Sequence, residues 1–172
     1  MEIIMETIMS FEQKQIDRKC RVFGELFKRS AILGYDSQLF IEQIMTTPEY
    51  NDLIQLDEGQ EWCDECFLMK CFEDIKPFKK GNKYLDEFTL WFMGYLYKYW
   101  MITKHKSPQE VYKVLNFRNF LLSFSFYHTQ NWDYIINDAT NSTKNNTWDT
   151  ELTINDLAPI MFSHKKPSNV LV

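Results

Sequence analysis

The sequence predicts an all-α fold, a compact multi-helix bundle around a central aromatic helix at about residues 83–106, with an irregular C-terminal tail. In several segments the apolar residues recur at steps of three and four, the spacing that lines one face of an α-helix. Residues that start and stop helices separate these segments. Aromatic residues make up 16% of the chain, and their large side chains supply the buried area of a dense core.

The first predicted helix runs between Ser10 and Gly34. Ser10 can cap its start, and Gly34 can end it because glycine readily adopts the left-handed conformation found just past helix ends. The helix has one apolar stripe, formed by Ile16, Cys20, Phe23 and Phe27. Charged residues occupy the other face, so we expect one buried and one solvated side.

Two short helices and an amphipathic one are expected next. Asp36 or Ser37 can cap a helix that must stop near Thr47, because the proline that follows disfavours helical geometry in the residue before it. That proline, Pro48, can open the following short helix. Residues 61–74 then predict a helix with two neighbouring buried stripes, Trp62, Cys66 and Met69 beside Cys63, Phe67 and Cys71. Residues 77–82 form a loop by composition.

The segment 83–106 predicts the central helix. Apolar residues cover it nearly all round, and a helix of this kind must be surrounded by other helices. Gly94 is the exception, because a glycine costs about 1 kcal/mol of helix propensity relative to alanine. That cost is most easily tolerated where another backbone passes close by. We therefore predict a tight helix crossing at Gly94.

Three more helices are expected before the tail. Ser107, Pro108 and Glu110 combine a capping hydroxyl, a proline at the first helical position and a glutamate that can reach back to the cap. They predict a short helix at 108–115, and apolar runs predict another at 116–126 and a short last one at 132–136. From residue 138, Asn, Thr and Ser compete with helical backbone for hydrogen bonds. We predict one helical domain at 1–137 and a flexible or docked tail at 138–172.

Composition and charge argue against several classes of protein. The net charge of -5 and the pI near 5.2 repel phosphate backbones, which argues against direct nucleic-acid binding. The first ten residues carry acids where a secretion signal needs positive charge, and no apolar run reaches membrane-spanning length. The clustered cysteines do not resemble a secreted disulfide scaffold. We expect a cytoplasmic protein that makes no membrane contact.

The most suggestive chemical feature is the cluster Cys63, Cys66 and Cys71, since thiolates at this spacing can contribute to a zinc site. Such a site needs four ligands, and the histidines, at 105, 128 and 164, are distant in sequence. A glycine-rich phosphate loop is also absent. We therefore predict no metal and no cofactor, and we assign the cysteines to the packing of an amphipathic helix.

His128 is the candidate for catalysis, because histidine can act as an acid, a base or a ligand near neutral pH. It lies between Tyr127 and Thr129 at an expected helix end, where a capping and turn role is favoured. The sequence supplies no evident orienting partner or nucleophile for a triad. We predict a protein that is not an enzyme and keep an enzyme as an alternative.

An acidic segment suggests a second alternative. Residues 57–74 carry seven acids and a single base, Lys70. Such a face can imitate the phosphates of a nucleic acid or bind a basic partner. The alternative interpretation is a helix face that is simply exposed to solvent. The candidate contact residues on it are Glu61, Asp64 and Glu65. The corresponding function is a phage or mobile-element inhibitor of a host defence or nucleic-acid-binding protein.

Three motifs carry a resemblance to known proteins: WFMGYLYKYW at 91–100, SPQEVYK at 107–113 and YHT at 127–129. Together they resemble a group of small proteins from low-GC Gram-positive bacteria, some of which are encoded beside toxin-like genes of the ADP-ribosyltransferase type. The similarity is greatest from about Trp91 to Ile136, with a looser helical correspondence back to the first long helix. The resemblance implies an antitoxin-like or toxin-regulating role, with a toxin as the protein partner.

The aromatic excess, the acidic faces and the lack of a recognisable catalytic motif agree with that role. We predict a non-enzymatic protein-binding module, antitoxin-like or another inhibitor, whose partner is a toxin or a defence or regulatory protein. Tyrosine and tryptophan dominate the energetics of protein interfaces. The candidate anchors are Tyr97, Trp100, Tyr127 and Trp132.

Overall fold

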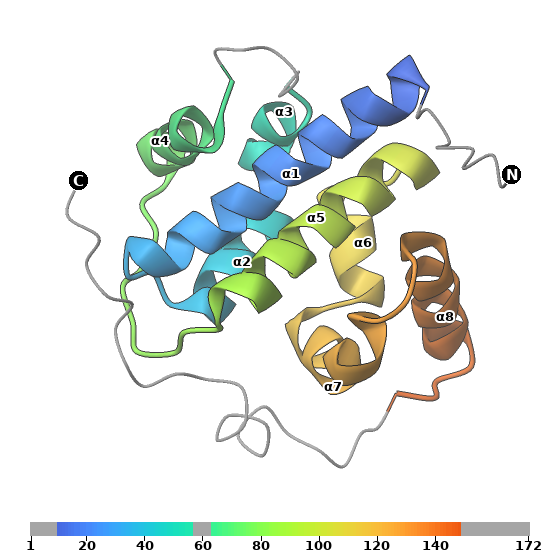
Figure 1. Cartoon of the computed structure of the whole chain (residues 1–172). Helices are drawn as coiled ribbons and strands as arrows, with labels where there is room; N and C mark the ends of the chain where they lie inside the picture. Colours follow the sequence, from blue (N-terminus) through green and yellow to red (C-terminus); the bar gives the residue numbers. More distant parts are fainter. Residues whose placement is uncertain (1–9, 57–62, 149–172) are drawn as a thin grey trace, which may run out of the picture.

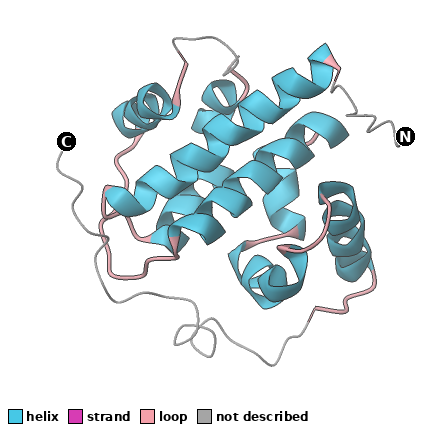
Figure 2. Cartoon of the chain, viewed as in Figure 1, coloured by secondary structure: helices cyan, strands magenta, loops and turns pink. Residues whose placement is uncertain are grey.

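The computed structural model describes residues 10–56 and 63–148. Within these ranges the regular structure is helical, as Figures 1 and 2 show. The helices in chain order are α1 (Phe11–Ile32), α2 (Ser37–Thr46), the 3-10 helix η1 (Pro48–Tyr50), α3 (Asn51–Ile54), α4 (Glu65–Ile75), α5 (Glu87–Lys104), α6 (Pro108–Val114), α7 (Phe117–Tyr127) and α8 (Trp132–Lys144). The predicted all-α fold is confirmed.

Helix α5 is the central element of the bundle. In Figure 1 it lies beside α1, with α6, α7 and α8 on its other side. Four consecutive residues span a full helical turn, and here all four are buried: Tyr95, Leu96, Tyr97 and Lys98. The helix is therefore covered all round in this part, as its apolar circumference predicts.

Helices α1 and α5 approach each other closely at two glycines, Gly24 and Gly94. A Cβ atom on Gly94 would lie 2.6 Å from the backbone oxygen of Phe23 and 3.0 Å from the Cα of Gly24. A Cβ atom on Gly24 would lie 3.0 Å from the backbone oxygen of Trp91. Both glycines thus make room for the opposite helix, and the predicted tight crossing at Gly94 is confirmed.

Local signals place most helix ends where the sequence predicts them. The Ser10 hydroxyl accepts the Gln13 N–H at 3.1 Å and caps α1. Gly34 follows α1 in the left-handed conformation with φ 77°, which glycine adopts without steric cost. Asp36 caps α2 by accepting the Leu39 N–H at 3.1 Å.

The start of α6 is a complete capping box. The Ser107 hydroxyl accepts the Glu110 N–H at 3.2 Å, and the Glu110 carboxylate accepts the Ser107 N–H at 2.8 Å. Each side chain satisfies a backbone N–H that has no partner inside the helix.

Removing this cap is expected to weaken the fold modestly. The Ser107→Ala variant should lower the free energy of unfolding by about 1 kcal/mol, because the Glu110 N–H loses its acceptor. Urea denaturation followed by circular dichroism measures the change. The control is Ser125→Ala on the exposed face of α7, which should be as stable as the wild type. Equal midpoints for the two variants would show that the box contributes nothing.

Helix α5 begins later than the sequence pattern predicts. It starts at Glu87 rather than near residue 83, because Asp86 caps it by accepting the Thr89 N–H at 3.0 Å. Leu85 precedes the helix and is nevertheless buried, and its N–H donates to the Ser37 hydroxyl at 3.0 Å. The apolar run therefore contains a buried loop end as well as a helix.

Helix α8 extends to Lys144, so the predicted start of the tail at residue 138 falls inside a helix. Its buried stripe continues through Ala139. The hydroxyl of Thr140 donates to the Ile136 carbonyl at 2.7 Å, and that of Thr143 donates to the Val114 carbonyl at 3.2 Å. These threonines bond to the helix or to a neighbour instead of breaking the helix. The apolar residues of the predicted tail, 152–162, lie outside the described residues.

The buried face of α4 differs in part from the predicted one. Met69 and Cys63 are buried as predicted, and Trp62 lies outside the described residues. Leu68, Met69 and Phe72 face the core, whereas Cys66 is exposed and Phe67 is 39% exposed. Two apolar stripes compete on this short helix, and the stripe with leucine and phenylalanine removes more apolar area from water than the one with cysteine. The assignment of Cys66 to core packing is therefore wrong.

Candidate functional site

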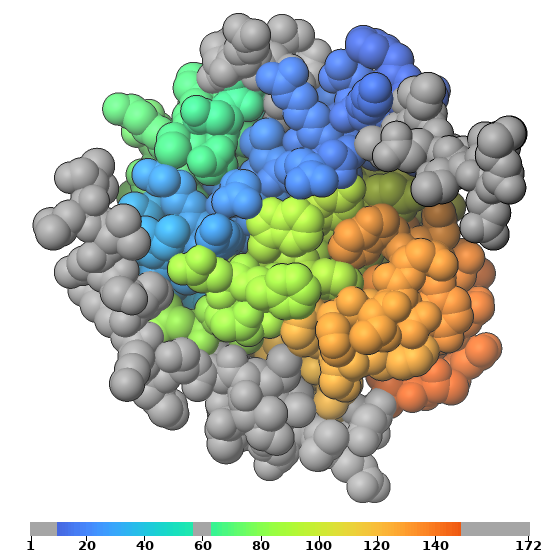
Figure 3. All heavy atoms as spheres, viewed as in Figure 1, coloured from blue at the N-terminus to red at the C-terminus, as the bar shows by residue number. Residues whose placement is uncertain are grey.

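Aromatic side chains from α5, α7 and α8 gather at the protein surface. We call this group the aromatic surface, and its members are Phe88, Trp91, Tyr99, Phe124 and Trp132. Phe88 is 55% exposed, and the other four are half-buried. Figure 3 shows this face of the molecule, with α5 in yellow-green next to α7 and α8 in orange. Large rings are thus presented together to solvent.

The rings pack on one another below this surface. Trp132 stacks on Tyr95 with 4.7 Å between ring centroids, and its ring lies 4.8 Å from that of Phe92. Phe92 in turn lies 5.5 Å from Phe124, which is 6.2 Å from Phe88. These contacts restrict the rotamers of the exposed rings, so the aromatic surface is ordered by its own packing.

Polar groups border the aromatic surface. The Tyr95 hydroxyl donates to Asp17 of α1 at 2.8 Å, and Asp17 also pairs with Arg21 at 2.7 Å. Burial, followed by the hydrogen bond to Asp17, raises the pKa of Tyr95 above its ordinary value, so the phenol stays protonated. Near the other end, the Tyr99 hydroxyl donates to Asp133 at 3.3 Å. An apolar centre with a polar rim is the usual anatomy of a protein interface.

Only one of the four predicted anchors reaches this surface. Trp132 is half-buried at the start of α8, but Tyr97, Trp100 and Tyr127 are 0%, 4% and 1% exposed. The Tyr97 hydroxyl donates to the buried Leu115 carbonyl at 2.7 Å. As surface anchors these three residues are wrong, because neighbouring helices bury Tyr97 and Trp100 on α5 and Tyr127 at the end of α7. They belong to the core.

The acidic candidates lie elsewhere in the fold. Asp64 caps α4 by accepting the Phe67 N–H at 2.8 Å, and Glu65 is half-buried in the first turn of that helix. Glu61 lies outside the described residues. Figure 1 shows α4 on the opposite side of α1 and α5 from α7 and α8. The acidic face and the aromatic surface are therefore separate.

The cysteines occupy three different environments. Cys63 is buried, Cys66 exposed and Cys71 half-buried. In the described part of the chain, no three His, Cys, Asp or Glu side chains lie close enough together to hold a metal ion. Partial desolvation and the nearby carboxylates of Glu65 and Asp64 raise the pKa of the Cys66 thiol although the residue is exposed, which favours the less nucleophilic protonated form.

His128 contacts an aromatic neighbour. Its Nδ1 lies 2.9 Å from the Phe124 carbonyl oxygen, and its ring lies 5.5 Å from the Phe124 ring. The adjacent Tyr127 hydroxyl donates instead to Asp138 at 2.8 Å. His128 and Tyr127, side by side in the sequence, thus take part in different contacts.

No protein-family model, curated protein or solved structure matches this chain. Among the helices of the described ranges, none combines the length and apolarity needed to cross a membrane. The function of the chain must therefore be inferred from its own surface.

Proposed function

We propose that this protein is a cytoplasmic, non-enzymatic protein-binding module, antitoxin-like or another inhibitor, that holds its partner on the aromatic surface. The observation that supports the proposal is the exposure of these rings, above all of Phe88, which is 55% exposed although it lies against Phe92 and Phe124. Covering apolar area contributes about 25 cal/mol per Å² to binding before the costs of association.

The shape and border of the surface favour a protein over a small ligand. The rings spread across three helices, whereas a small ligand is usually enclosed in a concave pocket. Charged residues at the border, Asp17, Arg21 and Asp133, can fix the orientation of a partner through polar contacts. Trp132, which contacts the rings of Phe92, Tyr95 and Tyr99, is of the residue type that most often dominates binding energy.

A toxin is the proposed class of partner. The resemblance of the motifs at 91–100, 107–113 and 127–129 to small proteins encoded beside toxin-like genes supports this choice. The first of these segments contributes directly to the surface, since it supplies Trp91 and Tyr99 and since Phe92 and Tyr95 pack beneath Trp132. An antitoxin of this kind acts by covering a functional surface of the toxin.

Co-purification tests the proposal. The tagged full chain is expressed in its native host with its gene neighbours intact, and we expect one stoichiometric protein partner. Phe88→Asp and Trp132→Ala should each weaken that complex at least tenfold, because the first places a charge on the apolar surface and the second removes an anchor. The matched control is Phe11→Asp at the start of α1, where the phenylalanine is 78% exposed and outside the aromatic surface.

Other results would favour a different function. If no stoichiometric partner is recovered, or if Phe88→Asp and Trp132→Ala bind the partner as well as Phe11→Asp does, the proposal is wrong. If the double charge reversal Asp64→Lys and Glu65→Lys abolishes binding while the aromatic variants retain it, the acidic face is the contact surface instead. Circular dichroism and a thermal midpoint confirm that each variant is folded.

A further inference from the structure

A hollow of about 310 Å³ opens beside the aromatic surface, where the start of α5 lies against α1. Its described lining residues are Lys28 of α1 and Glu87, Phe88 and Trp91 of α5. We call it the Trp91 hollow. Because Phe88 and Trp91 also belong to the aromatic surface, the hollow is continuous with that surface. Its volume is at the lower end of the range for ligand pockets, so it suits one side chain of a partner better than a whole organic molecule.

Among the described residues, Trp91 ends a row of stacked aromatic side chains. The Trp132 and Tyr95 rings stack with 4.7 Å between their centroids, and the Tyr95 and Trp91 rings follow with 5.1 Å. An edge of the Trp91 indole rests on α1, since a Cβ atom added to Gly24 would lie 3.0 Å from its Nε1. Tyr95 is one turn after Trp91 on α5, whereas the hollow lies one turn before it. The indole face turned away from Tyr95 therefore lines the hollow, where a planar group can extend the row.

One ammonium group at the hollow faces two carboxylates. The Lys28 Nζ atom lies 3.7 Å from an oxygen of Glu87 and 3.8 Å from an oxygen of Glu25. Both distances are longer than a hydrogen bond, so these carboxylates keep acceptor sites for another donor. The Glu87 side chain is 53% exposed and thus within reach of a partner. Two acids and one base leave an excess of negative charge, so the hollow favours a cation over an anion.

The neighbouring arginines of α1 do not supply the missing positive charge. Arg21 is paired with Asp17 at 2.7 Å, and Arg29 lines a different hollow between α1 and α4. The residue before Glu87 is a further acid, Asp86, which caps α5 and offsets the positive end of its dipole. The excess of negative charge therefore persists when the surrounding groups are included, in agreement with the net charge of -5 on the whole chain.

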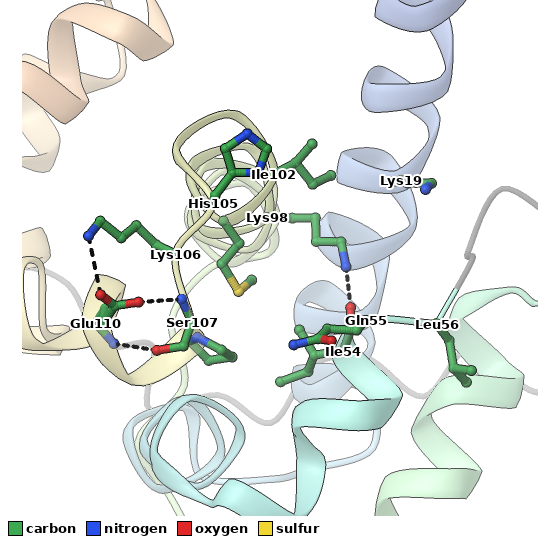
Figure 4. Close-up of a pocket in the computed structure, with 12 residues that line it drawn as sticks. Lys19, Ile54, Gln55, Leu56, Lys98, Ile102, His105, Lys106, Ser107 and Glu110 are labelled. Atoms are coloured by element: carbon green, nitrogen blue, oxygen red, sulfur yellow. Dashed lines mark hydrogen bonds and ion pairs between the residues drawn. The ribbon is translucent and has the colours of Figure 1, made fainter.

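A second cavity, of about 620 Å³, lies where α1, α3, α5 and α6 meet. Figure 4 shows two of its lysines in contacts within the fold: Lys98 donates to the Ile54 carbonyl, and Lys106 pairs with Glu110 at 3.2 Å. Its described lining includes no phenylalanine, tyrosine or tryptophan. This cavity therefore lacks the stacking face that Trp91 provides in the smaller hollow.

We propose that the Trp91 hollow receives an arginine side chain of the protein partner. This inference rests on the proposed function and names the chemistry of one contact that the partner makes. The planar guanidinium group stacks on the face of Trp91 that lines the hollow, and its N–H groups donate to the carboxylates of Glu87 and Glu25. A lysine brings the charge without a planar group, and an uncharged planar group cannot pair with the carboxylates.

Titration of the full chain with single amino-acid probes tests the preference of the hollow without the partner. The probes are the N-acetyl amides of arginine, citrulline, lysine and glutamate. Citrulline has the shape of arginine without its charge, lysine has the charge without the plane, and glutamate reports whether Lys28 recognises an anion instead. The signal is the indole N–H resonance of Trp91, which is identified by its absence from the spectrum of Trp91→Phe.

We expect the arginine probe to shift this resonance to saturation and to bind at least threefold tighter than each of the other three probes. The proposal is overturned if the resonance does not respond to arginine. It is also overturned if citrulline, lysine or glutamate binds as tightly as arginine does.

Two glutamine variants test the carboxylate at the hollow. Glu87→Gln should weaken the arginine probe at least threefold, because the guanidinium group loses its charged acceptor. Glu12→Gln is the matched control, since Glu12 is also an exposed glutamate in the first turn of a helix and lies outside the hollow. It removes the same charge from the whole chain and should bind the arginine probe as the wild type does. Equal affinity of the two variants would overturn the role of Glu87.

The complex with the partner separates this inference from the proposed function. Glu87→Lys should weaken the complex recovered from the native host at least tenfold, whereas Glu12→Lys should leave it unchanged. If no partner is recovered while the arginine probe still binds, the proposed function is wrong and the arginine preference of the hollow stands. If Phe88→Asp and Trp132→Ala weaken the complex but Glu87→Lys does not, the aromatic surface holds the partner and the arginine contact is wrong.

Discussion

The Gly94→Ala variant is expected to lose about 2–3 kcal/mol of the free energy of unfolding, and Gly94→Val is expected not to fold stably. An added Cβ atom would lie 2.6 Å from the Phe23 backbone oxygen and 2.9 Å from the Phe27 ring. Backbone cannot move aside as a flexible side chain does, so α1 and α5 must separate and the core around Phe27 must open. The overlap outweighs the gain of about 1 kcal/mol that alanine brings to a helix interior.

Chemical denaturation measures the free energy of unfolding of Gly94→Ala and of Gly24→Ala, so the losses at the two positions can be compared. At Gly24 an added Cβ atom would lie 3.0 Å from the backbone oxygen of Trp91 and 3.0 Å from Nε1 of its side chain. The side chain can shift, so only the backbone contact is fixed. Gly24→Ala should therefore lose less stability than Gly94→Ala does. A wild-type or higher midpoint for Gly94→Ala would mean that the two helices are not in close backbone contact.

The free energy of unfolding is also expected to fall steeply above about pH 10. Burial raises the pKa of Tyr97 well above its ordinary value, and burial likewise raises the pKa of Tyr50 and Tyr127. In the unfolded chain a tyrosine ionises near pH 10, whereas the buried phenol keeps its proton. Its contribution to stability is thus complete below pH 10 and is lost as the pH rises toward the folded-state pKa. Each such tyrosine removes about 1.4 kcal/mol per pH unit in that interval.

Urea midpoints at several pH values, with tyrosinate absorbance as a second signal, test this dependence. For Tyr97→Phe, the free energy of unfolding should fall less steeply as the pH rises above 10. The difference in slope should correspond to one proton per molecule. At pH 7 it should also lose about 1 kcal/mol, since the Leu115 carbonyl loses its donor. Tyr134→Phe, at a 43% exposed position, is the matched control and should keep the wild-type midpoint at pH 7. Tyrosinate absorbance that rises fully before unfolding would contradict the prediction.

The sequence predicts the parts of this fold that local chemistry determines. Ser10, Asp36 and Ser107 act as caps because a short polar side chain can reach the free N–H groups of a helix start. The crossing at Gly94 was predictable for a related reason, since a glycine inside an apolar helix weakens that helix unless a neighbouring backbone fills the space beside it.

Features that depend on competition between distant segments were not predictable. On α4 two apolar stripes were possible, and the packing of neighbouring helices decides that Phe72 is buried and Cys66 exposed. On α8 the Thr143 hydroxyl donates to the carbonyl of Val114, a residue at the end of α6. Because this acceptor lies outside the segment, the composition of the segment alone could not show that the helix continues.

The candidate site shows the same limit. Around a helix that is apolar on all sides, periodicity does not show which rings face outward, so Tyr97 and Phe88 are indistinguishable by pattern. Phe88 lies in the first turn of α5, where fewer helices surround it, and that position was the available signal.

The pairing of α1 with α5 also determines the order in which the protein can form. Helix α1 ends at Ile32 and α5 begins at Glu87, so their contact closes a long loop and cannot precede synthesis of the second helix. At about 5–20 residues per second, the ribosome needs several seconds to make the intervening chain. During that interval Phe23 and Phe27 lack their partner helix. The apolar stripe of α1 is covered on this side only when α5 has been made.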